Sequence, residues 1–579
     1  MGIQAADAIV GALAGAGTRL MFGVPGGGPN LDVVGAASAA GLRFVLAHGE
    51  TAAAIMAASY ADLTGAPGSV LVTRGPGLAS ATNGIAHAAL DRLPVVVIAD
   101  TVPAAGRGRI SHQRIDQAAL GLSVAKAAAT VGGPRAAQAA EWLVREALAT
   151  PAGPVIATID DSATSTVPDS LTTSTMVDDA GGYGGTGGQG GTGGYGGTGG
   201  QGGTGGAVAV LAAALRAARR PVLLLGWAAI AHAAEIRAAL AGRGIPALHT
   251  YRARGILPDD GADAAGLVTG GTMEWPLLAA ADLIVALGVD EAEMIPASWE
   301  YAARTILITG PEGSRGYFTG ATALRLPLER ALDVLARGET HDWPPGTGRA
   351  VKADTAGRLL AAASAAPGRL APQQVAATVR AAAPPETIAT VDAGAHMLAV
   401  MPLWEVPEPR RLLISSGLAT MGYALPAAIA AALAAPRAPV VAFTGDGGLG
   451  MTLAEVETAV RLGLRVIVVV FNDAALSLIQ IKQQPNGQGG EEAVRYRRTD
   501  FAAAAVAMGA AGAAVGTERD LAAALADALR RPGPTVIDAS VDPACYPAIM
   551  DLSRGQAGRR SVPGTGRAGS LPTTREYAQ

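Results

Sequence analysis

The stretch from Pro439 to Asp473 constrains the fold more than any other part of this 579-residue chain. A short apolar run is broken by a glycine-rich turn around Asp446, and a strand of the buried type, VIVVVF, ends just before Asn472 and Asp473. Between the two strands we expect a short helix that starts with a capping box of Thr452 and Glu455. A strand, a short helix and a second strand predict a right-handed crossover and parallel pairing.

Asp446 and Asp473 would then follow the carboxyl ends of two neighbouring strands, where open α/β sheets bind ligands. Two carboxylates beside glycine amides suit a hard cation that carries a phosphate group. The plainer interpretation is an ordinary βαβ unit with two surface aspartates at loop starts. The residues of this stretch leave both interpretations open.

The same alternation of strands and helices runs through most of the chain and predicts an α/β protein with doubly wound parallel sheets. The first strands are expected at Leu20–Val24, Leu42–Ala47, Ser69–Thr73 and Pro94–Ala99. A second group is expected at Pro221–Leu225, Ile245–Leu248 and Leu283–Leu287. A third group begins with a helix at Gln373–Ala383 and a strand at Thr387–Thr390.

This pattern divides the chain into three α/β domains, at residues 1–161, 207–340 and 371–551. Segment 162–206 contains two copies of the 12-residue unit GGYGGTGGQGGT. Such a composition cannot build a packed core, so we expect a flexible linker. We expect a second linker at 341–370. The tail 552–579 is rich in Gly, Arg, Ser, Pro and Thr, which predicts disorder.

Composition excludes several classes of function. A formal net charge of -4 leaves no electrostatic footprint for nucleic acid or an anionic membrane. The start lacks the basic segment of a signal peptide, and no apolar run reaches transmembrane length. We therefore expect a cytoplasmic protein that binds neither nucleic acid nor membrane. The single cysteine, Cys545, excludes a disulfide within the chain and a cysteine-cluster zinc site.

Three turns follow predicted strands of the first domain. Gly26 lies in the first turn, Glu50 follows His-Gly in the second, and Gly75-Pro76-Gly77 forms the third. Glycine amides could cradle a phosphate, but the Gly-Lys-Ser/Thr of a P-loop and the GxGxxG fingerprint are missing here. Taken alone, Glu50 is most simply a carboxylate in the first turn of a helix, where it is electrostatically favoured.

Taken together, these motifs resemble those of thiamine diphosphate (ThDP) enzymes of the acetolactate synthase group. The GDG turn and the closing Asn472-Asp473 pair resemble the ThDP motif, whose closing pair is more often Asn-Asn. The FGVPGG, HGE and TRGPG turns resemble the family's first domain. The resemblance implies pyrimidine-binding, central and diphosphate-binding domains, in that order. It also implies that Asp446, Asp473 and the carbonyl of Ala475 bind Mg²⁺.

The resemblance also assigns roles to other residues. Glu50 would share a proton with N1′ of the aminopyrimidine, and Met421 would hold the cofactor in its bent shape. Gln113 is implied as an active-site contact to the substrate. The remaining implied cofactor contacts are Gly26, Gly75, Pro76, Gly77, Asn83, Ala395, His396, Ala419, Gly445, Gly447 and Gly448.

The implied activity is that of an acetolactate synthase-like carboligase. It would decarboxylate pyruvate or a similar 2-oxo acid and transfer the resulting unit to a second carbonyl. In this family, the two domains that share a cofactor belong to different subunits, which implies a homodimer or a homotetramer.

Two alternatives stay open. The altered segment LSLIQIKQQ after Asp473 favours a 2-oxo acid decarboxylase that does not ligate. A ThDP-binding protein without catalysis is the other. Related central domains often hold FAD, but Gly288–Pro296 departs from their pattern, so FAD is not favoured.

Overall fold

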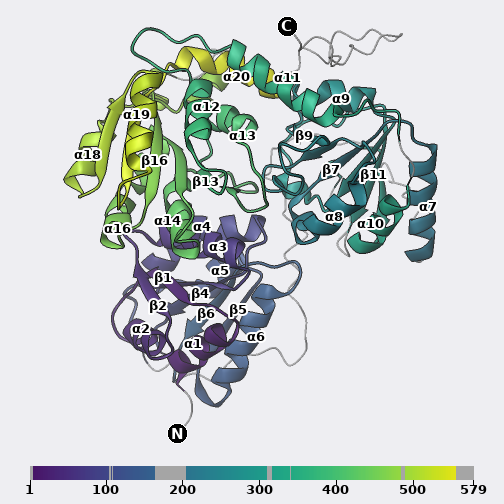
Figure 1. Ribbon diagram of the computed structural model, residues 1–579. Coiled ribbons are helices and arrows are strands. Elements are labelled where there is room, and N and C mark those ends of the chain that lie inside the picture. Colours follow the sequence, from purple (N-terminus) through teal and green to yellow (C-terminus); the bar gives the residue numbers. More distant parts are fainter. Residues whose placement is uncertain are drawn as a thin grey trace.

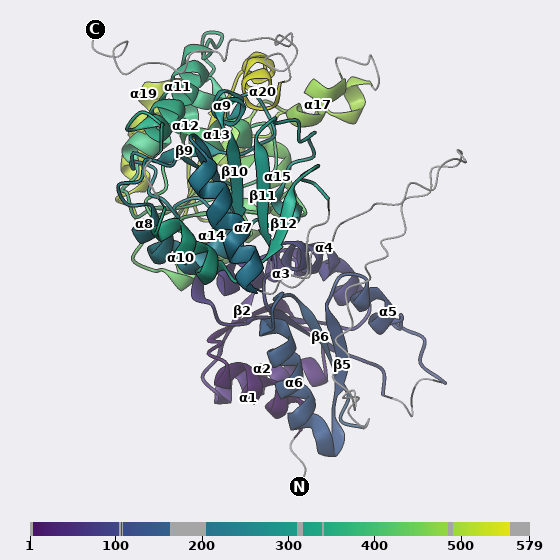
Figure 2. The same ribbon diagram turned by 90° about the vertical axis from the view of Figure 1, so that its right-hand side faces the viewer.

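The computed structural model describes residues 4–103, 106, 108–162, 204–309, 316–338, 341–483 and 490–555. These residues form three six-stranded sheets, each built from parallel strands with helices packed on it (Figures 1 and 2). The predicted α/β class with three parallel sheets is therefore confirmed.

The first sheet has the strand order β2-β1-β3-β4-β6-β5. Its four inner strands, β1, β3, β4 and β6, are apolar and almost fully buried, as expected for parallel strands covered on both faces. They are β1 (Leu20–Val24), β2 (Arg43–Leu46), β3 (Gly68–Val72), β4 (Val95–Asp100), β5 (Ala127–Val131) and β6 (Val155–Ile159). The helices are α1 (Ala5–Gly15), α2 (Pro29–Ala39), α3 (Glu50–Thr64), α4 (Pro76–Leu90), α5 (Gln117–Leu122) and α6 (Ala136–Leu148).

The central sheet has the order β12-β11-β10-β7-β8-β9. Its strands are β7 (Pro221–Leu225), β8 (Ala247–His249), β9 (Ala264–Leu267), β10 (Leu283–Leu287), β11 (Arg304–Thr309) and β12 (Thr322–Arg325). The accompanying helices are α7 (Thr204–Ala217), α8 (Ala233–Leu240), α9 (Trp275–Ala280), α10 (Leu328–Ala336) and α11 (Thr347–Ala361).

The third sheet has the order β14-β13-β15-β16-β18-β17. Its strands are β13 (Ile388–Val391), β14 (Leu412–Ile414), β15 (Val440–Gly445), β16 (Val466–Asn472), β17 (Ala511–Val515) and β18 (Thr535–Ser540). Its helices are α12 (Pro372–Ala382), α13 (Met397–Leu403), α14 (Ala424–Ala434), α15 (Asp446–Thr452), α16 (Glu455–Arg461), α17 (Ser477–Gln483), α18 (Phe501–Ala507), α19 (Glu518–Ala528) and α20 (Tyr546–Arg554). Strand β13 lies between β14 and β15, so the chain crosses to one side of β13 to form β14 and then to the other side to form β15. This reversal creates a topological switch point, where such sheets bind ligands.

The first and third domains share one hydrophobic core. Helices α3 and α14 lie against each other there, as Figure 1 shows. Both are alanine-rich, and every residue of α14 from Ala424 to Ala432 is buried. Small side chains allow the helices to approach closely, so the first domain is seated beside the switch-point sheet.

The central domain contacts both of the other domains through the segment after β8. Arg252 donates hydrogen bonds to the Asp91 carbonyl, at 2.6 Å, and to the Asp62 carboxylate, at 3.1 Å, in the first domain. Arg254 is buried and donates to the carbonyls of Met401 and Trp404 in the third domain.

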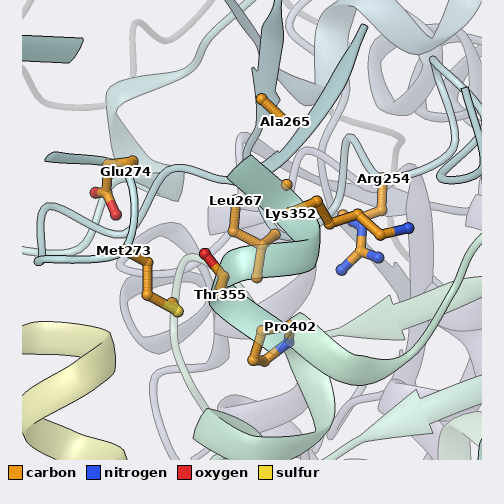
Figure 3. A pocket seen from close by; sticks show the side chains of 9 residues that line it. Arg254, Ala265, Leu267, Met273, Glu274, Lys352, Thr355 and Pro402 are labelled. Atoms are coloured by element: carbon orange, nitrogen blue, oxygen red, sulfur yellow. The ribbon is translucent and has the colours of Figure 1, made fainter. Parts of the chain in front are cut away.

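Figure 3 shows the small cavity next to Arg254 and Lys352, with a volume of about 10 Å³. That is room for about one water molecule, so it is not a ligand site.

Two segment boundaries are shifted by contacts distant in sequence. The expected linker 341–370 contains α11, which packs on β9. Helix α20 continues through Arg554, into the segment expected to be a tail. It does so because Thr272 donates to the Asp551 carbonyl, at 3.1 Å, and Thr269 donates to the Ser553 carbonyl, at 2.9 Å. The expected glycine-rich linker up to residue 203, and residues 556–579, lie outside the described residues.

None of the helices in the described part of the chain has the length and apolar character needed to cross a membrane.

Candidate functional site

Asp446 and Asp473 lie at one edge of the third sheet. Asp446 is the first residue of α15, directly after β15, and Asp473 directly follows β16. Because β15 and β16 pair in parallel, with Gly445 opposite Phe471, both carboxylates emerge at the same edge. Asp446 accepts hydrogen bonds from the amides of Gly447, at 2.7 Å, and Ala475, at 3.2 Å. The predicted placement of the two aspartates is confirmed.

The electrostatics of this pair favour a cation. Burial raises the pKa of Asp446, although hydrogen bonds from backbone amides oppose the shift. Burial raises the pKa of Asp473 to about 6; the Ser477 hydroxyl, which donates to it, lowers that pKa, and the neighbouring Asp446 carboxylate raises it. A buried carboxylate and a half-buried one that repel each other are stabilised when a cation binds between them. Within the described ranges, no group of three or more His, Cys, Asp or Glu side chains could hold a metal.

A cavity of about 460 Å³ extends from these aspartates. It is bounded by the third domain and by segments of the central domain. The predicted site residues that line it are Ala395, His396, Ala419, Met421, Gly445, Asp446, Gly447, Gly448, Asp473 and Ala475. The structure thus brings together all the site residues predicted for the third domain.

His396 provides a neutral polar group in the cavity wall. Its ring stacks on Phe471, with ring centroids 5.2 Å apart. Burial lowers its pKa to about 4, so the imidazole is uncharged near neutral pH. Its Nε2 atom is buried and has no hydrogen-bond partner. A buried polar atom without a partner is costly, and a bound ligand with a matching group would satisfy it.

Asp392 holds the Met421 segment against the sheet. Its carboxylate accepts hydrogen bonds from the Tyr423 amide, at 2.7 Å, and the Thr444 hydroxyl, at 2.8 Å. A Cβ atom on Gly448 would lie 2.2 Å from that carboxylate, so only glycine fits there. The sequence did not single out this positioning role of Asp392. Ala419, in the same segment, has a φ of 53°, the left-handed region that glycine favours.

The predicted glycine turns of the first domain form a separate cluster. Asp100 connects them, because its carboxylate accepts hydrogen bonds from the Arg74 amide, at 2.8 Å, and from the Asn30 side chain, at 2.9 Å. Asn30 in turn accepts from the Gly26 amide, at 3.1 Å. A Cβ atom on Gly75 would lie 2.2 Å from the Gln113 carbonyl, so this turn also requires glycine. The cluster includes Pro76 and Gly77, which begin α4.

Within one chain, none of the described first-domain residues lines the cavity of the third domain. Glu50 begins α3 and is partly exposed, and Gln113 is exposed with a φ of 56°. Asn83 accepts a hydrogen bond from Thr420, which stands between the cavity-lining residues Ala419 and Met421. A single chain therefore does not bring Glu50 to Asp446.

The predicted capping box of Thr452 and Glu455 is wrong. Thr452 ends α15, and α16 begins at Glu455 without a side-chain cap. Glu455 is buried and instead accepts hydrogen bonds from the amides of His48, at 2.9 Å, and Gly49, at 3.1 Å. A partner about 400 positions away in sequence is invisible to a local pattern. The turn that precedes Glu50 is therefore fixed by the third domain.

The central domain contributes a wall that the sequence did not predict, including Glu293. Its carboxylate accepts hydrogen bonds from the Thr250 hydroxyl, at 2.5 Å, and the Trp227 amide, at 3.1 Å. Burial raises its pKa to about 7, and the Thr250 hydrogen bond and the Arg252 charge oppose that shift.

This raised pKa predicts a pH-dependent stability. The folded chain holds the Glu293 proton more tightly than the unfolded chain, so the stabilisation is complete below about pH 4.5 and is lost as the pH rises through 7. The loss is at most roughly 3 kcal/mol. Glu293→Gln mimics the protonated form. The thermal midpoint of this variant minus that of the wild type should therefore increase from pH 5 to pH 8. The same dependence of the thermal midpoint on pH in the variant and the wild type would contradict this prediction. The exposed Glu235→Gln on α8 is the control.

Comparison with known proteins decides the family. Models of the thiamine pyrophosphate enzymes (the same cofactor as ThDP) match three parts of the chain. The N-terminal TPP-binding domain matches residues 3–120, the central domain 208–310 and the C-terminal TPP-binding domain 392–539. This chain is a ThDP enzyme. It resembles the acetolactate synthases within that family, as the sequence predicted.

The relatives of this ThDP enzyme are named for different activities. An acetolactate synthase of Bacillus subtilis is 28% identical, over 93% of each chain. A probable 2-ketoarginine decarboxylase of Pseudomonas aeruginosa is also 28% identical, over 88% of this chain and 89% of its own. A solved 4-hydroxybenzoylformate decarboxylase of Rhodococcus jostii shares the fold, with a TM-score of 0.74, 20% identity and coverage of 93% and 99%. Similarity does not separate ligation from decarboxylation.

Proposed function

We propose that this enzyme is a ThDP- and Mg²⁺-dependent carboligase that acts on 2-oxo acids in the cytoplasm. Asp446, Asp473 and the Ala475 carbonyl would hold Mg²⁺ at the sheet edge. His396 and the glycine amides of α15 would face the diphosphate. When bound, ThDP supplies an electron sink for the loss of CO₂ from a 2-oxo acid. FAD is not part of the proposal, and a visible absorption spectrum of the purified protein tests for it.

One observation carries this proposal. Two mutually repelling carboxylates, buried Asp446 and half-buried Asp473, stand at the switch-point edge of a sheet matched by the C-terminal TPP-binding domain. Buried groups of like charge are costly without a cation between them. The same cavity offers a neutral, unpartnered imidazole nitrogen and an apolar wall, a combination that suits a cofactor with a charged end and an aromatic body.

The proposal includes a dimer in which each site is shared. Glu50 and Asp446 belong to domains that a single chain does not join at one cavity. We therefore place Glu50 of one subunit over the cavity of its partner, and Gln113 with it. There Glu50 would hold a proton at N1′ of the aminopyrimidine. A tetramer would contain two such pairs.

Product analysis tests the activity. Purified enzyme with ThDP, Mg²⁺ and a panel of 2-oxo acids, read by mass spectrometry, should give CO₂ and a hydroxy-oxo acid. Two of the similar proteins are named as decarboxylases, which favours a second candidate, simple decarboxylation. Aldehyde and CO₂ without a ligated product would establish that candidate and rule out the carboligase. ThDP binding without turnover of any panel member would support a non-catalytic protein.

Asp473→Asn should keep cofactor binding, within about tenfold of the wild type, because the amide oxygen can still coordinate the cation. The same change removes one of two adjacent carboxylates that repel each other, so the cofactor-free variant should melt at a higher temperature than the wild type above pH 7. Calorimetric titration with Mg²⁺ and ThDP and a thermal melt check both effects. Complete loss of binding would contradict the metal-site assignment.

A further inference from the structure

A loop without helix or strand carries the predicted cofactor contacts Ala419 and Met421. It runs from residue 415 to residue 423, between β14 and α14. Five of its residues line the cavity: Ser415, Ser416, Gly417, Ala419 and Met421. A Cβ atom on Gly447 would lie 3.6 Å from the Met421 Cε atom, so the tip of Met421 reaches the start of α15, next to Asp446. The position of this loop therefore decides where Met421 stands in the cavity.

Asp91, from the first domain of the same chain, holds the start of this loop. It follows α4, which lies on the side of the first domain facing the third (Figure 1), and it is buried. Its carboxylate accepts hydrogen bonds from the amides of Gly417, at 2.6 Å, and Ser416, at 3.2 Å. Among the described residues, neither amide donates to a backbone carbonyl. The loop therefore has its first anchor in another domain.

His87, one turn earlier in α4, provides a second anchor. Its Nδ1 atom lies 3.0 Å from the Ser415 hydroxyl and 3.2 Å from the Asp91 carboxylate. The Ser415 hydroxyl in turn accepts a hydrogen bond from the Thr420 amide, at 3.2 Å. A chain of polar contacts thus runs from Asp91 to the residue that precedes Met421.

Asp91 is itself fixed and charged. Its carbonyl accepts a hydrogen bond from Arg252 of the central domain, at 2.6 Å. Burial acts to raise the pKa of its carboxyl, but His87 and Arg252 outweigh burial and hold that pKa below its usual value. The carboxyl is therefore ionised near neutral pH, and an ionised acceptor makes stronger hydrogen bonds than a neutral one.

The plainer explanation is that these contacts only stabilise the interface between the two domains. The apolar core that α3 and α14 share already joins these domains, whereas Asp91 contributes directed polar contacts to a cavity-lining loop. In the same loop, the left-handed conformation of Ala419 costs energy and is kept only where surrounding contacts impose it. A loop held in this way from outside is what a precise ligand contact requires.

From these contacts we infer that Asp91, with His87, is a positioning residue: it holds the loop so that Met421 supports the bent shape of ThDP. Neither of these two described residues lines the cavity, so each acts through the loop. The inference rests on the proposed function, because it needs ThDP bound in this cavity and the role that the family resemblance implies for Met421.

Amide exchange in the cofactor-free protein tests whether Asp91 holds the loop. Asp91→Asn keeps the shape and one acceptor oxygen, but its NH₂ group cannot accept the second amide. The amides of Ser416 and Gly417 should exchange about ten- to a hundredfold faster in this variant, as expected for a lost charged hydrogen bond, while the amides of β16 keep their rates. Hydrogen–deuterium exchange read by mass spectrometry measures both. Unchanged exchange in the loop would overturn the inference. Faster exchange throughout the third domain would do the same, since Asp91 would then only stabilise the fold.

A double-mutant cycle with Met421 tests the positioning itself. The bent shape brings the two rings of ThDP together, so the rate at which the thiazolium C2 proton exchanges with D₂O reports the bend without any substrate. Asp91→Asn and Met421→Ala should each slow this exchange about ten- to a hundredfold, the cost of a small misplacement. The double variant should be no slower than Met421→Ala, because residues that act through one another are not additive. Losses that multiply, or a loss in only one of the single variants, would contradict the inference.

The matched control is Asp282→Asn in the central domain. The Asp282 carboxylate also accepts from two consecutive amides, those of Arg219, at 2.7 Å, and Arg220, at 2.9 Å, but it does not line the cavity. This variant should change neither exchange rate. Should Asp91→Asn fail to fold, His87→Leu replaces it, because leucine has a similar volume and removes the contact with the Ser415 hydroxyl. Slower C2 exchange in His87→Leu supports the inference, and the wild-type rate overturns it.

Both exchange measurements work without turnover, which separates this inference from the proposed function. If the wild type releases CO₂ without a ligated product, carboligation fails as a proposal, and the two measurements still decide the role of Asp91. In the active enzyme, Asp91→Asn should lower kcat at saturating ThDP by a factor similar to that of the C2 exchange and leave the KM of the donor within about threefold. A raised KM with an unchanged kcat would refute the positioning role.

Discussion

Replacing Glu50 by glutamine is expected to cut turnover by about 10²- to 10⁴-fold, the usual contribution of a positioned proton-transfer group. Glutamine has nearly the same shape and can still hydrogen bond, but it cannot share a proton with the aminopyrimidine. Because Glu50 does not touch the diphosphate end, Mg²⁺ and ThDP should still bind. Steady-state kinetics and calorimetric titration measure the two effects separately.

The control for this prediction is Glu235→Gln, which changes another glutamate in the first turn of a helix, one whose side chain is exposed. It should keep its turnover. Wild-type rates in Glu50→Gln would show that Glu50 is only the helix-start carboxylate that its position in α3 suggests. Loss of ThDP binding in the same variant would show that it holds the cofactor rather than its proton.

The second large effect is expected at the metal site. Asp446→Ala should weaken the binding of ThDP in the presence of Mg²⁺ by at least about a hundredfold, because it removes a carboxylate ligand and the acceptor of the Ala475 amide. Asp7→Ala, which also removes a first-turn aspartate, should have no such effect. Binding is read by calorimetry at several Mg²⁺ concentrations. Affinity that stays Mg²⁺-dependent and unchanged in Asp446→Ala would mean that the cation lies elsewhere.

Strand positions were predictable because their signal is local. Mainly apolar runs followed by Gly or Pro identified Leu20–Val24, Pro221–Leu225 and Leu283–Leu287 at the observed bounds. The placement of Asp446 and Asp473 was equally accessible, since two consecutive parallel strands must end at the same edge. For these features, sequence separation is short and each residue's local preference agrees with the fold.

Features that depend on distant partners were not predictable. The capping-box prediction failed because Glu455 is used by the amides of His48 and Gly49 in another domain. Arg554 was placed in a tail, because nothing in its own segment shows that Thr269 and Thr272 would bind α20. The cavity wall contributed by α20 and by the central domain depends on such contacts, and so substrate preference is the part that the sequence reveals least.

Sharing of each site between two subunits is the central claim, and mixing two inactive variants tests it directly. Glu50→Gln chains and Asp446→Ala chains are refolded together in equal amounts. A mixed dimer then contains one site with both changes and one site with neither. Half of the dimers are mixed, so the mixture should recover about a quarter of wild-type activity. If Glu50 and Asp446 of the same chain serve one site, each site keeps a defect, and the mixture will be no more active than the variants alone.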